Sequence, residues 1–457
     1  MFKQIASRSS SRLFRPIFER RCAAIWQETP VEIRYWDGRR FQTGQGPPRV
    51  TMELRDPAVL LALLADPSLG FGNSYTDGRL RIDGDLQALL GESFQHAFWK
   101  QPAGMSTRTR KWLRYFKNLP ILRGQAVRNA RHHYDQGNVF FRRWLDPSMS
   151  YSCAYFRTPE DDIQQAQTQK LELICRKLRL QPEQSLLDVG CGWGALLFHA
   201  IEHYGVHGVG VTPSRQQSEF IRAEAERRGI GDRLTLHTAD WREITGRYDR
   251  VVSVGMFEHV GKACHGRFLR RWREWLKPGG VSLLHTIGTM HALPPDPWIE
   301  RNIFPGGYLP SLGEITRHAS SSKLLVADLE NLWQHYDLTL ARWIENFGMA
   351  RDELEKMTSE SFARMWWLYL HASRAAFRTG RCHLWQLILT SDKTAPHPLT
   401  RDEYRVPAAH AMPAEPASAA SPATAASAPR EPALFAPHQV DGQPSEPSIM
   451  RSQRAAD

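Results

Sequence analysis

Long apolar runs are missing from this chain. Although 42% of its 457 residues are hydrophobic, no segment offers the ~18 consecutive apolar residues that a membrane-spanning helix needs. Residues 1–26 are basic and rich in serine, and they lack the continuous apolar stretch of a secretory signal. We therefore expect a cytoplasmic protein with no segment that crosses a membrane.

Cysteine is scarce and irregularly spaced. The six cysteines include no Cys-x-x-Cys pair, the spacing typical of zinc sites and redox motifs. They are Cys22, Cys153, Cys175, Cys191, Cys264 and Cys382. This scatter argues against a disulfide framework and fits a reducing compartment.

Acidic residues are absent from residues 108–131, in a chain of net charge +11. That stretch carries eight arginines and lysines, with Trp112, Tyr115 and Phe116 interleaved at helical spacing. A basic amphipathic helix of this kind can lie on an anionic membrane surface. The solvated face of an ordinary packed helix is an equally good interpretation. Nucleic acid is a third candidate partner, but no recognition motif accompanies the charge, so we expect none.

Large apolar residues become rare after about residue 406, where alanine, proline and serine dominate. Such a composition cannot bury enough apolar surface to order itself. We divide the chain into a basic N-terminal segment (1–22), a small α+β domain (23–106), a basic helical connector (107–131), a large domain (132–405) and a disordered tail (406–457).

Strand and helix patterns alternate before the tail. In the small domain, Val50–Leu54 alternates like a half-buried strand and Ala58–Leu64 has the pattern of a helix. In the large domain the predicted strands are Ser185–Val189, Val206–Val211, Leu234–His237, Arg250–Val254 and Val281–Ile287. The predicted helices include Pro213–Arg228, Cys264–Leu276, Leu338–Asn346 and Arg351–Arg378. This order favours an α/β fold with a doubly wound parallel sheet, and Leu384–Thr390 is expected as a late edge strand.

A glycine turn follows the first strand of the large domain. Asp188 ends an apolar strand, and Gly190, Gly192 and Gly194 come after it. Glycines leave no Cβ in the way, so a ligand can lie against bare backbone before the next helix begins. Tight turns also need glycine without any ligand, so the pattern alone is weak evidence for a nucleotide-type site.

Polar residues after the next two strands strengthen the case for a nucleotide. The second strand ends at Thr212 without an acid for the ribose hydroxyls, but Gln217 could bind them instead. After the third strand, Asp240 could accept from an adenine amino group and Trp241 could stack on its ring. Trp241 taken alone is better explained as core packing.

The run Asp-x-Gly-x-Gly-x-Gly in this setting resembles the class I S-adenosylmethionine (SAM)-dependent methyltransferases, which have a Rossmann-like sheet. Other blocks narrow the resemblance to the cyclopropane-fatty-acyl-phospholipid synthases and their mycolic acid relatives. These blocks are His133–Asn138, Trp144–Phe156, Gly255–Gly261, Ile303–Pro310, Glu330–Leu332 and His335-Tyr336. The resemblance is strong over about residues 131–390 and looser in the small domain.

The resemblance implies transfer of a methylene group from SAM to a cis double bond of a phospholipid acyl chain. The resulting carbocation loses a proton to a bound bicarbonate, and a cyclopropane ring closes. The implied bicarbonate residues are Cys153, Glu258, His285, Ile287 and Tyr336. Cys153 and Ile287 would contribute mainly backbone groups, and Glu258 would orient the bicarbonate and receive its proton.

The resemblance also implies the residues that bind SAM. Tyr151 and Ser152 would lie near its methionine end, with Gly190 and Gly192 beneath it. Thr212 and Gln217 would face the ribose, and Asp240 and Trp241 would face the adenine. Asp188, at the end of the strand, would meet a cationic group of the ligand.

Each catalytic residue also has an ordinary structural interpretation. Cys153 could be a small buried thiol, His285 a core histidine and Tyr336 a residue of an amphipathic helix. Glu258 beside His259 could suggest a metal site, but adjacent residues cannot easily face one ion and no third ligand is near, so we expect no metal. The joint occurrence of the set favours the catalytic interpretation.

The sequence therefore predicts a membrane-peripheral enzyme on the inner face of the cytoplasmic membrane. The small domain and the connector would dock on anionic phospholipid and support a homodimer. Methylation of the same double bond without ring closure, giving a branched or methylene-bearing chain, is the nearest alternative. A non-catalytic lipid-binding relative is a second alternative.

Overall fold

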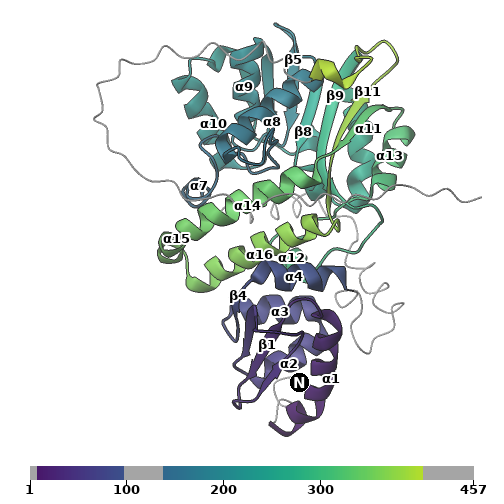
Figure 1. The fold of residues 1–457 in the computed structure, drawn as a ribbon. Coiled ribbons are helices and arrows are strands. Elements are labelled where there is room, and N and C mark those ends of the chain that lie inside the picture. The colour runs from purple at the N-terminus through teal and green to yellow at the C-terminus, as the bar shows by residue number, and fades with distance from the viewer. Residues whose placement is uncertain (1–7, 97–136, 405–457) are drawn as a thin grey trace, which may run out of the picture. The chain divides into compact units, whose positions relative to one another are not determined.

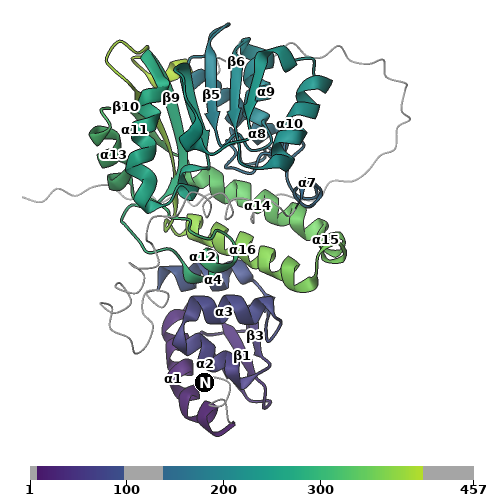
Figure 2. The ribbon, with the colours of Figure 1, turned by 180° about the vertical axis from the view of Figure 1, so that it is seen from behind.

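The computed structural model describes residues 8–96 and 137–404 (Figures 1 and 2). The predicted basic connector (107–131), the predicted tail (406–457) and residues 1–7 lie outside the described residues. Within the described ranges, no helix is long and apolar enough to cross a membrane.

The N-terminal part is a four-stranded sheet with four helices. The strands are β1 (Val31–Tyr35), β2 (Arg40–Gln42), β3 (Val50–Leu54) and β4 (Leu80–Gly84), in the spatial order β2-β1-β3-β4. The helices are α1 (Arg8–Ile25), α2 (Pro57–Ala65), α3 (Pro67–Thr76) and α4 (Leu86–Gln95). Asp56 and Asp66 cap α2 and α3, each followed by a proline at the first helical position. The strand and helix predicted here are confirmed.

The C-terminal part contains a seven-stranded sheet in the order β10-β11-β9-β8-β5-β6-β7. Its strands are β5 (Ser185–Val189), β6 (His207–Val211), β7 (Leu234–His237), β8 (Tyr248–Val254), β9 (Leu276–Gly288), β10 (Leu325–Asn331) and β11 (His383–Thr390). Neighbouring strands from β7 to β9 pair in parallel, which confirms the five predicted strands and the doubly wound arrangement.

The prediction of an edge strand at Leu384–Thr390 is wrong. β11 lies inside the sheet, antiparallel to both β9 and β10, and β10 occupies the edge. β10 is half-buried or exposed along its length and contains Asp328 and Glu330, so its sequence has little of the apolar pattern of a strand.

Helices cover both faces of the large sheet. Figure 1 shows α8 (Ile163–Lys177), α9 (Ala195–Tyr204) and α10 (Arg215–Arg227) on one face, and α11 (His265–Trp275) and α13 (Leu312–Ser321) on the other. The short α7 (Asn138–Arg142) precedes α8. The helix predicted over 351–378 is interrupted: α15 (Arg351–Met357) ends, and Ser359 caps a new helix, α16 (Glu360–Arg378).

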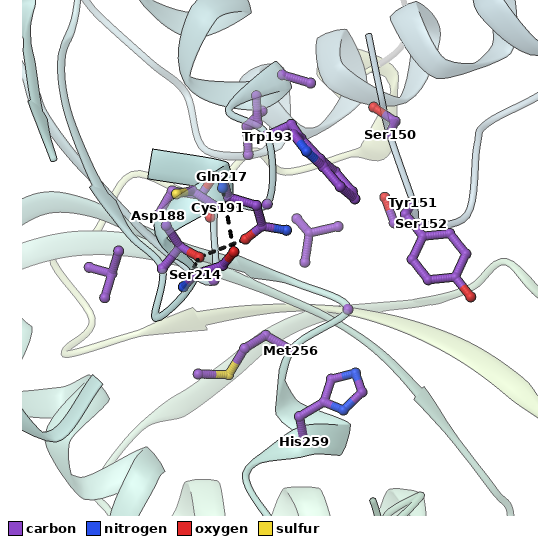
Figure 3. Close-up of a pocket in the computed structure, with 18 of the residues that line it drawn as sticks. Ser150, Tyr151, Ser152, Asp188, Cys191, Trp193, Ser214, Gln217, Met256 and His259 are labelled. Carbon is purple, nitrogen blue, oxygen red and sulfur yellow. Dashed lines mark hydrogen bonds between the residues drawn. The ribbon is translucent and has the colours of Figure 1, made fainter. Parts of the chain in front are cut away.

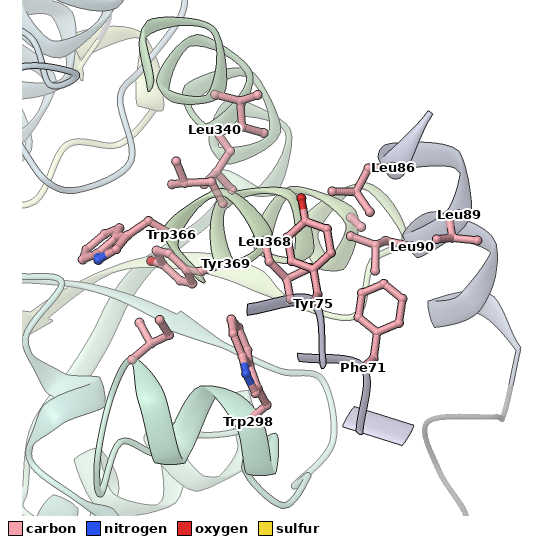
Figure 4. Packing of buried hydrophobic residues seen from close by; sticks show 14 of the residues in the cluster. Phe71, Tyr75, Leu86, Leu89, Leu90, Trp298, Leu340, Trp366, Leu368 and Tyr369 are labelled. Atoms are coloured by element: carbon pink, nitrogen blue, oxygen red, sulfur yellow. The ribbon is translucent and has the colours of Figure 1, made fainter. Parts of the chain in front are cut away.

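Helices α14 (Trp333–Met349) and α16 pack on each other, and α16 also packs against α3 and α4 of the N-terminal part. Figure 4 shows Phe71 and Leu90 facing Leu368 of α16. Ser68 donates to the carboxylate of Asp296 (2.8 Å), which also caps α12 (Pro297–Asn302). The N-terminal part therefore contacts the same helices that approach the candidate site.

Candidate functional site

A cavity of about 150 Å³ lies at the carboxyl ends of β5, β6 and β8. This is the edge at which doubly wound sheets bind ligands. Figure 3 shows Asp188 and Gln217 on one side of the cavity and Tyr151 on the other. Nine of the ten predicted SAM-binding residues line it: Tyr151, Ser152, Asp188, Gly190, Gly192, Thr212, Gln217, Asp240 and Trp241. The tenth, Gly194, instead precedes α9 and packs near Phe198 and Ile221.

The glycine turn exposes backbone to the cavity. Gly190 has a φ of +86°, and a Cβ on it would lie 2.6 Å from Cγ of Met256. Gly192 has a φ of +55°, and a Cβ there would meet no atom within 4 Å. Both positions favour glycine because L side chains rarely adopt this backbone conformation. The turn leaves room for a ligand against the main chain.

Side chains at the ends of β6 and β7 are held by short polar contacts. The Thr212 hydroxyl donates to Oε1 of Gln217 at 2.6 Å, so the amide nitrogen of Gln217 is left to serve another group. Asp240 accepts from the guanidinium of Arg242 at 2.8 Å, and that guanidinium also lies over the ring of Trp241. Asp240 is therefore already ion-paired, a partner that the sequence did not reveal.

Lys170 lines the same cavity and was missed by the sequence prediction. Its ammonium is buried on α8 and donates to Oγ of Ser152 at 3.1 Å. Burial lowers the pKa of Lys170 to about 8. Asp188 lines the same cavity. Its Oδ1 is buried with no hydrogen-bond partner among the described residues, and burial raises the pKa of this carboxyl to about 7.

The sequence did carry a signal for Lys170. Gln167, Lys170 and Lys177 fall at helical spacing on the same face as Leu171 and Ile174, and all five are buried. Long polar side chains on the apolar face of a helix are rarely buried without partners, so they mark a buried polar site.

A second, mainly apolar cavity of about 240 Å³ adjoins the first. Tyr151, Gly255 and His259 line both cavities. Its wall includes three of the five predicted bicarbonate residues, Glu258, Ile287 and Tyr336. Residues of the N-terminal part complete it: Ser68, Phe71, Gly72, Leu90 and Phe94.

Glu258 is the buried acid of the second cavity. It lies in a 3₁₀ turn after β8 and is only 5% exposed. Its Oε1 accepts from the backbone N–H of Ile287, whereas Oε2 is buried without a partner among the described residues. Burial raises the pKa of Glu258 to about 7, although its hydrogen bonds oppose the shift. The carboxyl is thus poised to exchange a proton near neutral pH.

His285 and Cys153 line neither cavity. His285 lies on β9, and its ring accepts from the amide of Gln386 at Nδ1 while Nε2 is buried without a partner in the described part of the chain. Burial lowers the pKa of His285 well below its ordinary value. Burial raises the pKa of Cys153, so its thiol is not an activated nucleophile.

Tyr336 completes the predicted set from α14. Its ring stacks on Phe377 with centroids 4.3 Å apart. Like Cys153, which lies between α7 and α8, Tyr336 comes from outside the sheet.

Comparison with known families identifies both parts of the chain. Residues 123–387 match the model of the mycolic acid cyclopropane synthetase family, and residues 23–100 match a domain family of unknown function. A cyclopropane-fatty-acyl-phospholipid synthase of Escherichia coli is 38% identical over 74% of this chain and 87% of its own length. A probable fatty acid methyltransferase of Pseudomonas putida is 33% identical over 82% of this chain and 96% of its own length.

Solved structures agree with this assignment. The cyclopropane synthase MmaA2 from Mycobacterium tuberculosis superposes with a TM-score of 0.56 at 33% identity, covering 57% of this chain and 97% of that one. The mycolic acid cyclopropane synthase CmaA1, complexed with SAH and CTAB, gives a TM-score of 0.56 at 34% identity, with coverage of 57% and 97%. The chain therefore belongs to the mycolic acid cyclopropane synthetase family of SAM-dependent methyltransferases.

Proposed function

We propose that this enzyme transfers a methylene group from SAM to a cis double bond in a phospholipid acyl chain and forms a cyclopropane ring. The observation that carries the proposal is the pair of adjoining cavities that share Tyr151, Gly255 and His259. One has the glycine turn of a nucleotide-type site, and the other is apolar with a buried acid. Donor and alkene can meet only where the two cavities join.

The reaction makes three demands on this junction. The π electrons of the alkene attack the sulfonium methyl, the C–S bond breaks, and S-adenosylhomocysteine (SAH) leaves. The carbocation then loses a proton from the new methyl carbon, and that C–H electron pair closes the ring. The site must exclude water, stabilise positive charge and hold a base within hydrogen-bonding reach.

Aromatic rings and burial can meet the first two demands. Tyr151 lines both cavities, and its hydroxyl lies 2.9 Å from that of Tyr369. Phe304 packs edge-on against Tyr369, with centroids 5.6 Å apart. Electron-rich ring faces near a developing carbocation would stabilise it without trapping it.

The predicted bicarbonate fits two unpaired groups, one on Glu258 in the wall of the second cavity and one on His285, which lines neither cavity but lies two residues from Ile287 of that wall. Oε2 of Glu258 and Nε2 of His285 are both buried without partners among the described residues. One is an acceptor and the other a donor, a combination that suits an anion carrying both a hydroxyl and bare oxygens. Glu258, His285 and Tyr336 would hold the anion with side chains, and Cys153 and Ile287 with backbone groups. When bound, bicarbonate supplies the base that takes the proton.

The methionine end of SAM would be recognised by charge. Lys170 is a cation in the wall of the first cavity, and Oδ1 of Asp188, in the same wall, has no hydrogen-bond partner among the described residues. Lys170 would bind the SAM carboxylate together with Ser152, and Asp188 would bind its ammonium. Each buried ionisable group would then gain a further opposite charge at hydrogen-bonding distance.

A phospholipid acceptor is supported by Arg381. This residue is half-buried in the wall of the second, mainly apolar cavity, and its guanidinium lies 5.6 Å from the ring centroid of Phe94. Within the described part of the chain it has no ion-pair partner, so it is available to a lipid phosphate. The enzyme would then work as a peripheral protein on an anionic bilayer; a homodimer remains a prediction from the family resemblance.

Methylation without ring closure is the second candidate. The Pseudomonas putida relative, a probable fatty acid methyltransferase, matches a larger share of this chain than does the Escherichia coli synthase. Both products gain one carbon, but only the methylene-bearing product keeps a double bond that takes up hydrogen. Mass spectrometry of lipids from cells that express the chain, before and after catalytic hydrogenation, distinguishes them.

A further inference from the structure

Four polar side chains from four elements form a line that ends at His285. The ammonium of Lys177 on α8 forms an ion pair with Glu330 of β10 and donates to Oε1 of Gln386 on β11 at 2.7 Å. Nε2 of Gln386 lies 3.0 Å from Nδ1 of His285 on β9. Lys177 and Gln386 are almost completely buried, at 2% and 1% exposure.

The chemistry of this line fixes the direction of each hydrogen bond. An ammonium can only donate, so the carbonyl oxygen of Gln386 must face Lys177. The amide nitrogen of Gln386 then faces His285, and an amide nitrogen can also only donate. Nδ1 of the imidazole must therefore accept, which places the proton of the neutral ring on Nε2.

The proton on Nε2 is the one without a partner. Nε2 of His285 is buried and unpaired among the described residues, as is Oε2 of Glu258. The two residues belong to one small region: the N–H of Gly255 donates to the carbonyl of His285, and that of Ile287 to Glu258. A buried unpaired donor is destabilising, and a bound acceptor would remove that penalty.

We propose that Lys177 and Gln386 are positioning residues that hold His285 in its Nε2–H tautomer, so that it donates a hydrogen bond to the bound anion of the active site. This inference rests on the proposed function for the identity of that anion, bicarbonate. The tautomer itself follows from the protein's own contacts and is present before any ligand binds.

Burial of Lys177 is difficult to explain by stability alone. Buried ion pairs are often replaced by apolar residues of similar volume without loss of stability. Here the partner, Glu330, lies on an edge strand and is partly exposed. What the buried ammonium does provide is an orientation for Gln386 that a methionine could not provide.

Nitrogen-15 NMR of the histidine-labelled full chain tests the tautomer directly. The His285 signal is assigned by its loss in His285→Asn. At neutral pH we expect a neutral ring protonated at Nε2, shifting towards the Nδ1–H form in Lys177→Met. A wild-type ring protonated at Nδ1, or an unchanged tautomer in Lys177→Met, would overturn the inference. This readout needs no turnover, so failure of the proposed function would be seen separately.

Kinetics provide a second measurement. Lys177→Met should raise the bicarbonate concentration needed for half-maximal rate by roughly tenfold or more, as expected for loss of a residue that orients a ligand group. Lys177→Arg, which keeps the donor, should recover part of the loss. Arg401→Met, which breaks the exposed ion pair with Asp328 on the same edge strand, is the matched control. An equal effect of Arg401→Met, or no recovery with arginine, would contradict a positioning role.

Discussion

The backbone N–H of Ile287 on β9 donates to Oε1 of Glu258, so an interior strand of the sheet holds the buried acid directly. The carbonyl of Glu258 in turn accepts from the N–H of Tyr308 at 2.9 Å, within the segment that follows β9. The first contact orients the carboxyl and the second holds the turn that carries it, while the second carboxyl oxygen remains unpaired among the described residues.

Glu258→Gln should abolish most of the activity. Glutamine can still accept from Ile287, so the turn keeps its structure, but it can neither receive a proton nor accept from an acidic hydroxyl at Oε2. We expect kcat to fall by about 10²–10⁴-fold, the usual contribution of a side chain that takes part in proton transfer. Calorimetry should find SAH binding unchanged; undiminished lipid modification would refute the role of Glu258.

The same variant should alter the pH dependence of stability. The pKa of Glu258 is raised from 4.5 to about 7 by burial, so the folded state resists ionisation that the unfolded state allows. Stability is therefore lost as pH rises through that window. Between about pH 5 and about pH 8, the wild type should lose on the order of 1–3 kcal/mol relative to Glu258→Gln in denaturant titrations. The raised pKa of Asp188 is present in both proteins and does not affect the difference between them. Parallel curves of unfolding free energy against pH would therefore contradict this expectation.

Lys170→Met should weaken SAM and SAH binding by roughly tenfold, because a buried charge-assisted hydrogen bond to the carboxylate is lost. Decarboxylated SAM has no such group, so its affinity should be nearly the same in the variant and the wild type. Isothermal titration with both ligands measures the difference. If Lys170→Met weakened both ligands equally, the residue would support the fold of the site rather than bind the carboxylate.

Arg381→Gln should raise KM for phospholipid vesicles several-fold with little change in kcat, since the guanidinium would contact the phosphate and not the double bond. Turnover of detergent-dispersed diacylglycerol with the same acyl chains should be unaffected. Arg378→Gln, a nearby exposed position outside the cavity wall, is the control. Equal losses with both lipids would remove the assignment of Arg381 to the phosphate.

Local sequence patterns predicted the parts of the fold that depend on local chemistry. The five parallel strands were identifiable because each is a short apolar run between helical patterns. β10 was not, because its residues are mostly half-exposed and its pairing partner, β11, lies more than fifty positions away in the sequence. The error at Leu384–Thr390 follows from that omission, since a strand whose neighbour is not recognised is assigned to the edge.

The candidate site, like the fold, was only partly predictable from the sequence. The glycine turn and the residues after β6 and β7 follow from their positions at strand ends, where ligands bind. Lys170 and the line from Lys177 to His285 depend on contacts between separate elements, whereas Arg242, the partner of Asp240, is only two residues away in the sequence. The family resemblance identified Glu258 and His285, but only the structure reveals that each keeps one buried polar atom with no partner in the described part of the chain.

The most direct measurement of the central claim is mass spectrometry of the product made by the purified full chain from SAM, bicarbonate and vesicles of a cis-unsaturated phospholipid. The account predicts one added CH₂ unit per modified double bond, in a product that takes up no hydrogen under mild catalytic hydrogenation. A product that gains the carbon but still takes up hydrogen, or lipid that leaves the reaction unchanged, would contradict it.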